Sequence, residues 1–330
     1  MDLKPILMCI LVPFLLGWRE GDDFVIQNWE EKDSVRIVLI GDTGQLPTEG
    51  DPFKMNKIQR EQLRQSLREE QATAIVDLGD LFYWKSPRCS KVFNSEQELK
   101  DIDAHLYDYV GGLKTPLFLV LGNHDVGPFA EHYLRRLNGG DFGKSSSARE
   151  RCYLQQPKIH DDVYFPSSVY GVDFGPVRMA VLHTSSPYRH WPSKDIGDFL
   201  DSADWSLLVG HHVYKTACDK EDEDIVLPWI ESGGIRPNIY ANGHAHILQL
   251  GHFEGTTAIT SGAGSKIRVF PDCDPKKTKG VVWGLSEFGY ATLDVDSEKI
   301  VVRYKNIVGD ELFCWERRRE DSFGAECIGS

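Results

Sequence analysis

The sequence predicts an α/β fold whose first half is built from strand–loop–helix units and whose second half is more antiparallel. Up to residue 137, short β-branched apolar runs alternate with helical segments, which is the pattern of βαβ units. From Gly280 to Cys314 the residues alternate in strand fashion instead, which is typical of antiparallel sheets. The 330 residues contain no internal repeat, and the length is sufficient for a sizeable core.

The first half contains expected strands that are each followed by an expected helix. Residues 34–40 are apolar and β-branched and end at Gly41, which indicates a buried strand. Residues 52–71 are rich in Arg, Gln, Glu and Leu, which favours a helix with one exposed face. The remaining elements of this half are strands 74–78 and 116–121 and helices 95–110 and 129–137. Residues 19–33 are polar and charged, and we interpret them as a lead-in to the first strand.

The second half follows an irregular, Gly- and Ser-rich stretch over 138–163, which predicts a surface excursion. Residues 169–174 and 177–182 flank a Gly-Pro pair and predict a hairpin. Two further strands are expected at 205–209 and 238–241. The charge cluster from Glu316 to Asp321 is interpreted as part of a solvated tail.

The expected domain organisation is a signal peptide over 1–20, a single domain over 34–314 and a polar tail over 315–330. The apolar run Pro5–Trp18 has 14 residues, too short to span a bilayer, and it fits the hydrophobic region of a signal peptide. Only Lys4 supplies positive charge and no A-x-A cleavage site follows, so a buried N-terminal segment is the alternative. Export predicts a secreted, periplasmic or lumenal protein without stable membrane insertion.

Six cysteines lie beyond the apolar run, at wide and irregular spacing. An even number is consistent with three disulfides in an oxidising compartment. The absence of a C-x-x-C pair disfavours a structural zinc site. The six are Cys89, Cys152, Cys218, Cys273, Cys314 and Cys327, and their spacing leaves the pairing open.

The composition is acidic, with 50 Asp and Glu against 37 Lys and Arg and a formal net charge of −13. Such a surface repels nucleic acid and anionic lipid, which disfavours a nonspecific nucleic-acid or membrane-surface binder. An anionic substrate would therefore need a local positive site, and a metal cluster is one way to supply it.

Residue types that bind metals come directly after successive expected strands. Active sites of open α/β folds gather at the carboxyl ends of strands, so these side chains are expected to converge on one edge. Carboxylates suit hard cations, imidazole suits zinc and iron, and a phenolate suits iron(III). The residues in question are Asp42, Asp80, Asn123, His211, His244 and His246. Singly, each could instead be a cap, a turn residue or a satisfied polar group.

Five short motifs contain these residues, in the order Gly41-Asp42-Thr43-Gly44, Gly79-Asp80-Leu81-Phe82-Tyr83, Gly122-Asn123-His124-Asp125, Gly210-His211-His212 and Gly243-His244-Ala245-His246. The ordered series resembles the binuclear metallophosphoesterases of the calcineurin-like superfamily, and specifically the purple acid phosphatases of the small, tartrate-resistant type. The wider superfamily has Asp-x-His in the first motif, whereas Gly44 stands here and Tyr83 completes the Gly-Asp-x-x-Tyr of the purple branch. Thr43 departs from the tryptophan common in the tartrate-resistant type.

The resemblance implies a fold and a metal site. The implied fold is a metallophosphoesterase-type β-sandwich of two mixed sheets flanked by helices, in αββα layers. The implied iron(III) ligands are Asp42, Asp80, Tyr83 and His246. The implied ligands of a divalent iron, zinc or manganese ion are Asp80, Asn123, His211 and His244, so that Asp80 bridges the two ions. Two such ions can clamp the attacking and phosphoryl oxygens together.

The resemblance also implies a function, an acid phosphatase that hydrolyses phosphate monoesters by attack of a metal-bound hydroxide. Its substrates would be phosphorylated small molecules or phosphoproteins. His124 is assigned to phosphate binding or to protonation of the leaving group, with Asp125 orienting it, and His212 to a further phosphate contact.

Two alternatives to this function stay open. One is a phosphodiesterase or nucleotide phosphohydrolase with a zinc or manganese pair, which the combination of Gly44 and Tyr83 disfavours. The other is a noncatalytic phosphate-binding module that kept the fold, which the intact set of ligand residues disfavours.

Overall fold

A computed structural model describes the segments on which the fold and the site depend. The described residues are 24–29, 32–83, 100, 104, 113–126, 162–185, 193–218, 226, 230, 232–268 and 278–327. The expected signal peptide, the helix expected at 129–137 and nearly all of the helix expected at 95–110 and of the stretch 138–163 lie outside them. Within this part of the chain, no helix combines the length and the apolar character that crossing a membrane requires.

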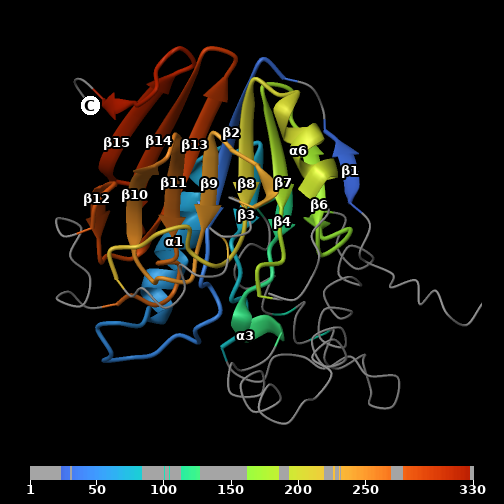
Figure 1. The fold of residues 1–330 in the computed structure, drawn as a ribbon. Coiled ribbons are helices and arrows are strands. Elements are labelled where there is room, and N and C mark those ends of the chain that lie inside the picture. Colours follow the sequence, from blue (N-terminus) through green and yellow to red (C-terminus); the bar gives the residue numbers. More distant parts are fainter. Residues whose placement is uncertain are drawn as a thin grey trace, which may run out of the picture.

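Two mixed β-sheets form the body of the molecule (Figure 1). In spatial order, the first sheet contains β1 (Val25–Asn28), β6 (Tyr170–Asp173), β7 (Val177–Val181), β8 (Trp205–Val209), β9 (Ile239–Asn242), β11 (Thr256–Ser261), β10 (Leu248–Phe253) and β12 (Val281–Leu285). The second contains β16 (Ala325–Glu326), β15 (Glu311–Arg318), β14 (Lys299–Asn306), β13 (Gly289–Asp296), β2 (Ser34–Ile40), β3 (Ala74–Asp77), β4 (Leu117–Leu119) and β5 (Val163–Tyr164). This arrangement confirms the predicted α/β fold of two mixed sheets.

One apolar core joins the two sheets. Ile37 and Phe118 of the second sheet belong to the same buried cluster as Leu207 and Ile259 of the first, and all four are fully buried. Helix α6 (Ser193–Asp201) packs on β7 and β8. Because apolar burial on this scale is the main stabilising term in a fold, the core fixes where the strand ends lie relative to each other.

Most of the predicted strands are confirmed within one or two residues. Strands β2, β3 and β4 pair in parallel, as expected of βαβ units, and β6 and β7 form the predicted antiparallel hairpin. Helix α1 (Lys57–Glu69) begins five residues later than predicted because Asn56 caps it. The Asn56 side chain accepts from the Gln59 amide and the Gln59 side chain accepts from the Asn56 amide, a capping box.

The structure corrects the interpretation of two segments. Residues 25–28, taken as part of a polar lead-in, form β1 and pair in parallel with β6. The charge cluster Glu316–Asp321 is not simply a solvated tail, because β15 continues to Arg318 and Trp315 is 1% exposed. Polar and charged side chains hid both strands, since β1 is an edge strand and β15 lies next to the short edge strand β16. A disulfide, Cys314–Cys327, ties the end of the described chain to β15, and Cys218 is also disulfide-bonded.

Candidate metal centre

The predicted ligands lie just beyond the carboxyl ends of strands from both sheets. Asp42 and Asp80 follow β2 and β3, His211 follows β8, and His244 and His246 follow β9. Asn123 begins the short helix α3 (Asn123–Val126) after β4. The parallel strands bring these ends together at one edge of the sandwich, as predicted.

One group of donor atoms gathers around Tyr83. Its hydroxyl donates to Asp42 Oδ1 at 2.7 Å and lies 2.8 Å from His246 Nε2. His246 Nε2 and Asp42 Oδ1 are themselves 3.1 Å apart. Asp42, Asp80 and His246 each direct a ligand atom into one cluster whose members lie within 4.8 Å of one another. The four residues implied as iron(III) ligands are therefore together.

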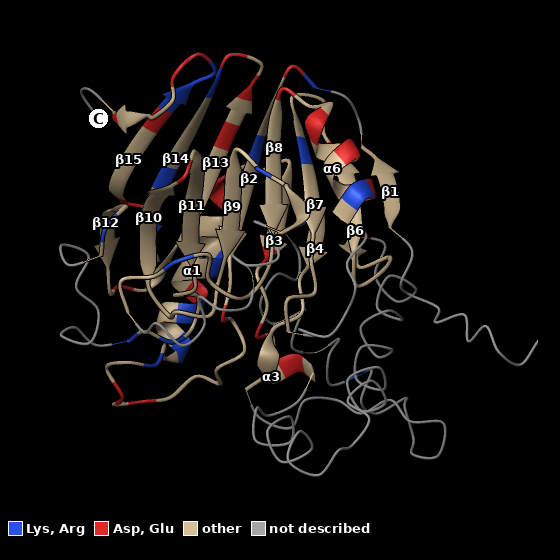
Figure 2. Ribbon diagram, in the orientation of Figure 1, with Lys and Arg blue, Asp and Glu red and all other residues tan. Residues whose placement is uncertain are grey.

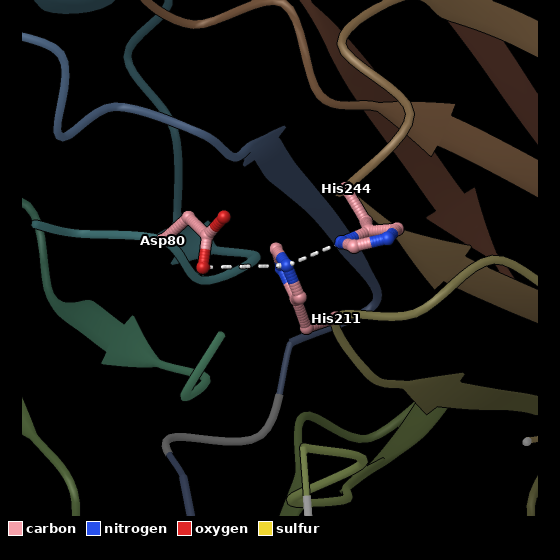
Figure 3. A group of neighbouring side chains, drawn as sticks. All are labelled: Asp80, His211 and His244. Carbon is pink, nitrogen blue, oxygen red and sulfur yellow. Dashed lines mark hydrogen bonds and ion pairs between the residues drawn. The ribbon is translucent and has the colours of Figure 1, made fainter. Parts of the chain in front are cut away.

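A second group of donor atoms surrounds His211. Its Nε2 lies 3.0 Å from Asn123 Oδ1, 3.0 Å from His244 Nδ1 and 3.4 Å from Asp80 Oδ1. Asn123 Oδ1 is also 3.0 Å from His244 Nδ1. Figure 3 shows Asp80, His211 and His244 pointing toward one another from three separate segments. Asp80 is common to both groups.

A hydrogen bond to the backbone, on the side of the ring opposite Nε2, fixes the orientation of His211. Its Nδ1 lies 2.8 Å from the carbonyl oxygen of Leu78, which is an acceptor, so Nδ1 carries a proton and Nε2 is the nitrogen that faces the cluster. His211 is fully buried. Hydrogen bonding of this kind holds a histidine in the tautomer and ring position that a metal ion needs.

The backbone at the site is strained. Asp42, Asp80, His244 and His246 have φ values of 58°, 58°, 66° and 55°, in the left-handed region that non-glycine residues rarely adopt. Such conformations each cost on the order of 1–3 kcal/mol and persist where the surrounding structure holds them for a function. Four of the seven predicted ligands share this feature, which is independent of their residue types.

Two glycines let the ligand loops approach each other. A Cβ on Gly122 would lie 2.1 Å from Asp80 Oδ1. A Cβ on Gly44 would lie 2.4–2.5 Å from backbone atoms of Leu81 and Phe82, and the Gly44 amide donates to the Asp80 carbonyl at 2.9 Å. The loop that carries Tyr83 thus occupies the space that a side chain at position 44 would need.

The charged groups of the cluster shift one another's pKa values. Burial would raise the pKa of Asp80, but the charge of His211 and its hydrogen bond outweigh burial and lower that pKa. Burial would lower the pKa of His211, and the charge of Asp80 overcomes this and raises it to about 10. Burial and the charges of Asp42 and Asp80 raise the pKa of the Tyr83 phenol well above its ordinary value. Cations at these positions would replace the protons and favour the ionised ligands.

The donor set fits a pair of metal ions. It combines two carboxylates, a phenol, an amide oxygen and three imidazoles, which suits iron, zinc or manganese. In octahedral geometry, ligand bonds of about 2.1 Å place neighbouring donors roughly 3.0 Å apart. Seven donor separations in the two groups, from 2.7 to 3.4 Å, lie around that value, and Asp80 lies within 4.8 Å of Asp42 and His246. Asp80, shared between the groups, is the residue that would bridge two ions.

Two of the three predicted catalytic residues, His124 and His212, lie beside the donor groups and differ in exposure. His124 has a side chain that is 40% exposed, with Nε2 4.0 Å from Asp80 Oδ2 and its ring 4.6 Å from that of Tyr83. His212 is buried, with Nδ1 3.0 Å from Thr184 Oγ1 and its ring 4.7 Å from that of His244. Burial lowers the pKa of both imidazoles.

Asp125, predicted to orient His124, contacts the backbone of the loops that carry the ligands. Its carboxylate accepts hydrogen bonds from the backbone amides of Asp80 at 2.9 Å, Phe82 at 3.1 Å and Gly122 at 2.7 Å. These bonds hold the Asp80–Tyr83 loop against the turn that precedes Asn123. The structure thus gives Asp125 a place in orienting the ligand loop, which the adjacency of Asp125 and His124 in sequence did not suggest.

Sequence reasoning missed Asp77 and Ser265. Asp77 Oδ2 accepts from Thr43 Oγ1 at 2.9 Å and Oδ1 from the Gly79 amide at 3.0 Å, so it links the segments that carry Asp42 and Asp80. Ser265 Oγ donates to the Asp42 carbonyl. The sequence feature that could have indicated Asp77 is a charged residue inside the apolar run 74–78. No sequence feature indicated Ser265, since its partners are distant in sequence.

Comparisons with known proteins agree with this geometry. The profile of the family described as Calcineurin-like phosphoesterase matches residues 35–248. Purple acid phosphatase 4 of Arabidopsis thaliana is 24% identical over an alignment of 340 positions, which covers 94% of this chain and 92% of that protein.

Solved structures share the fold at low sequence identity. Purple acid phosphatase PPD1 from yellow lupin (Lupinus luteus) seeds matches with a TM-score of 0.60 at 16% identity, over 87% of this chain and 54% of the lupin chain. This chain therefore spans about half the length of the lupin chain. GAP50, described as the anchor in the inner membrane complex of Plasmodium, matches with a TM-score of 0.59 at 16% identity, over 86% of this chain and 88% of that one.

The matched profile contains all seven predicted ligands, from Asp42 to His246, and these are the residues that the fold brings together. The chain therefore belongs to the calcineurin-like phosphoesterase family of hydrolases, and it resembles the purple acid phosphatases within that family.

Proposed function

We propose that the protein is an acid phosphatase that hydrolyses phosphate monoesters of small molecules or phosphoproteins at an iron(III)–divalent metal pair. The observation that supports this most is the position of the Tyr83 hydroxyl, within 2.8 Å of both Asp42 and His246. A phenol among carboxylate and imidazole donors favours iron(III), because the phenolate is a hard and strongly donating anion.

The residues assigned to the two ions follow from the two donor groups. Asp42, Asp80, Tyr83 and His246 would hold iron(III), and Asp80, Asn123, His211 and His244 would hold iron, zinc or manganese in the divalent state. Bound metal ions of this kind acidify water to supply a nucleophile and withdraw charge from phosphoryl oxygens. Positive charge held here would also attract phosphate to a protein whose net charge is −13.

His124 is the residue proposed to act on the leaving group. Its backbone amide donates to Asp80 Oδ1 at 2.9 Å, which fixes the start of α3 against the ligand cluster. Its imidazole is partly exposed beside the cluster, so it can reach a bound ester from the solvent side and transfer a proton to the departing alcohol. His212, packed on His244, is proposed to shape the floor of the phosphate site.

The remaining assignments extend the same proposal. We propose that the residues predicted as a single domain, 34–314, form one catalytic domain together with β1, the rest of β15 and β16, and that the chain is exported with its signal peptide at 1–20. The Cys314–Cys327 disulfide supports an oxidising compartment.

Two other functions are less well supported. A phosphodiesterase or nucleotide phosphohydrolase with a zinc or manganese pair leaves the position of Tyr83 without a role. A noncatalytic module is the other possibility, and GAP50, a structure of similar fold, is described as an anchor. The complete set of donor residues in this chain favours turnover instead.

Turnover with p-nitrophenyl phosphate and bis-p-nitrophenyl phosphate, from pH 4 to pH 8, tests the proposal. The expected result is faster hydrolysis of the monoester, with a maximum below neutral pH. Preference for the diester would support the phosphodiesterase instead. No turnover of either by protein that contains two metal equivalents would support the noncatalytic module.

A further inference from the structure

The hydroxyl of Thr184 contacts two neighbouring histidines of the metal centre. Thr184 lies just beyond β7, and its Oγ1 is 3.0 Å from the backbone amide of His211, 3.0 Å from the backbone amide of His212 and 3.0 Å from Nδ1 of the His212 ring. Thr184 is 0% exposed and His212 is 1% exposed, so bulk water does not compete for these bonds. The three contacts use the full hydrogen-bonding capacity of the hydroxyl.

The roles of donor and acceptor follow from the chemistry of these groups. A hydroxyl has one hydrogen to donate and two lone pairs with which to accept. Backbone amides can only donate, so the amides of His211 and His212 occupy both lone pairs of Thr184 Oγ1. The hydroxyl hydrogen then points to His212 Nδ1, which accepts it. A proton on Nδ1 would instead give this oxygen a third donor and leave the hydroxyl hydrogen without an acceptor.

His212 is thereby held in one tautomer. A neutral imidazole whose Nδ1 accepts a hydrogen bond carries its proton on Nε2. In His211, by contrast, Nδ1 carries a proton that faces the Leu78 carbonyl at 2.8 Å. The two histidines are adjacent in sequence, yet Nδ1 is a donor in His211 and an acceptor in His212. The hydroxyl of Thr184 thus separates the role of His212 from that of the predicted ligand beside it.

The Nε2 atom of His212 lacks an acceptor within the described residues. It is buried, and no protein atom there forms a hydrogen bond with it. The His212 ring packs 4.7 Å from the ring of His244 and 5.3 Å from the ring of His211, and both of these belong to the donor group that includes Asp80. A buried N–H without an acceptor destabilises a fold. A ligand bound at this donor group is the source of an acceptor that the position offers.

An oxyanion is the class of ligand that suits this donor. Hydrogen bonds to an ionised acceptor are roughly twice as strong as bonds between neutral groups. An uncharged N–H also adds no positive charge beside the metal ions, whereas an imidazolium would repel them. Figure 2 shows acidic side chains in the turns between strands at the end of the sheets away from α3. An anion at the metal centre, which adjoins α3, is remote from those carboxylates.

We propose that Thr184 is a positioning residue that locks His212 as an uncharged Nε2–H donor to an oxygen of the phosphate group held at the divalent site. In this role His212 is neither a metal ligand nor a proton-transfer residue, although it follows a predicted ligand directly in the sequence. This inference rests on the proposed function, because it assumes that the metal pair holds a phosphate group.

Nuclear magnetic resonance of protein with isotopically labelled histidine nitrogens tests the tautomer without turnover. The metal-free and zinc-loaded forms are both diamagnetic, and the loss of signals in His212→Gln identifies the two nitrogens of His212. The expected result is an unprotonated Nδ1 and a protonated Nε2, both in the wild-type protein and in Thr184→Ser. Thr184→Val keeps the shape of the side chain without the hydroxyl and is expected to populate the other tautomer. A protonated Nδ1 in the wild-type protein would overturn the proposal.

Thr216→Val is the matched control for the loss of a hydroxyl. Thr216 lies in the loop that follows His212, and its Oγ1 accepts from the backbone amide of Cys218 at 3.1 Å. Its replacement is expected to leave the nitrogen signals of His212 unchanged. The same change of tautomer in Thr216→Val as in Thr184→Val would show that any hydroxyl lost from this region disturbs His212, which would contradict a specific role for Thr184.

Calorimetric titration of the metal-loaded protein with inorganic phosphate tests the role of the Nε2–H. His212→Phe keeps a planar ring without nitrogens, and it is expected to retain two metal equivalents and to weaken phosphate binding about tenfold, as loss of one hydrogen bond to a charged group would. Thr184→Val is expected to weaken phosphate binding in the same direction, and Thr184→Ser to restore it. An unchanged phosphate affinity, or the loss of a metal ion, in His212→Phe would overturn the proposal.

The failure of this proposal is distinguishable from the failure of the proposed function. Metal-loaded wild-type protein that turned over no phosphate ester would refute the proposed function. The tautomer of His212 and the phosphate affinity of its variants would still decide the role of Thr184, because neither measurement requires turnover.

Discussion

The hydroxyl oxygen of Tyr83 lies 2.8 Å from Nε2 of His246, although the two residues are 163 positions apart in sequence. Tyr83 follows a strand of the second sheet and His246 follows a strand of the first. Their contact shows that both sheets contribute to one cluster of donor atoms. Several expected outcomes depend on this geometry.

Loss of Asp80 should remove both metal ions, because this residue belongs to both donor groups. Asp80→Ala and the more conservative Asp80→Asn are each expected to contain less than one metal equivalent and to lose nearly all turnover. Elemental analysis of purified protein measures the content. Asp173→Ala is the control, since Asp173 is a carboxylate paired with Arg178 away from the site. Two retained equivalents in both Asp80 variants would refute the bridging role.

Any side chain at position 44 should disturb the loop that carries Tyr83. Gly44→Ala places a Cβ 2.4 Å from the Leu81 carbonyl carbon, and a backbone contact of this kind does not relax easily. We expect a loss of about 1–3 kcal/mol in the free energy of unfolding, together with weaker metal retention. Denaturant unfolding and metal analysis measure the two effects.

Gly197→Ala in helix α6 is the control for the glycine substitution. A Cβ there meets nothing closer than 3.8 Å, so alanine should stabilise the helix by about 0.5–1 kcal/mol. If Gly44→Ala and Gly197→Ala were equally harmless, the steric explanation for Gly44 would be wrong.

Asp77 should be needed for metal retention although its side chain accepts hydrogen bonds from Thr43 and Gly79 rather than from the ligands. Asp77→Ala leaves a buried hydroxyl and a buried amide without acceptors, which costs about 1–3 kcal/mol each. We expect lower metal occupancy and a lower melting temperature. Thr43→Val removes one of the two bonds and should show a smaller effect in the same direction. An unaltered metal content in Asp77→Ala would show that the ligand loops hold their positions without it.

His124→Ala should keep both metals and slow turnover by roughly 10²–10⁴-fold, the contribution typical of a proton-transfer residue. The loss should be larger for an alkyl phosphate than for p-nitrophenyl phosphate, because a poor leaving group depends more on protonation. His252→Ala is a control, since that imidazole packs edge-on against Phe323, with the ring centres 4.8 Å apart. Equal losses for both substrates would assign His124 to phosphate binding instead.

The order of the motifs along the sequence was sufficient to predict which side chains lie together and much of the fold. Asp42, Asp80 and Asn123 each follow an apolar strand, and strand ends of one parallel sheet must meet. The backbone strain at Asp42 and the steric exclusion at Gly44 depend on neighbours distant in sequence, so neither could be predicted locally.

The strands that sequence analysis missed fall into two kinds, strands at or near a sheet edge and one strand that is fully buried. Strand β1 and the end of β15 lie at or near sheet edges, where one face meets solvent and polar residues are tolerated. Strand β11 has the sequence TTAITS and is fully buried between β9 and β10. In β11 tertiary burial outweighs the local pattern, whereas β1 is mostly exposed and is held by its pairing with β6.

The visible absorption spectrum of the metal-loaded protein tests the central claim most directly. A Tyr83 phenolate bound to iron(III) predicts a charge-transfer band in the visible region that disappears in Tyr83→Phe, while the metal content of that variant shows whether iron remains. A colourless wild-type protein that contains no iron yet hydrolyses phosphate monoesters would contradict the account.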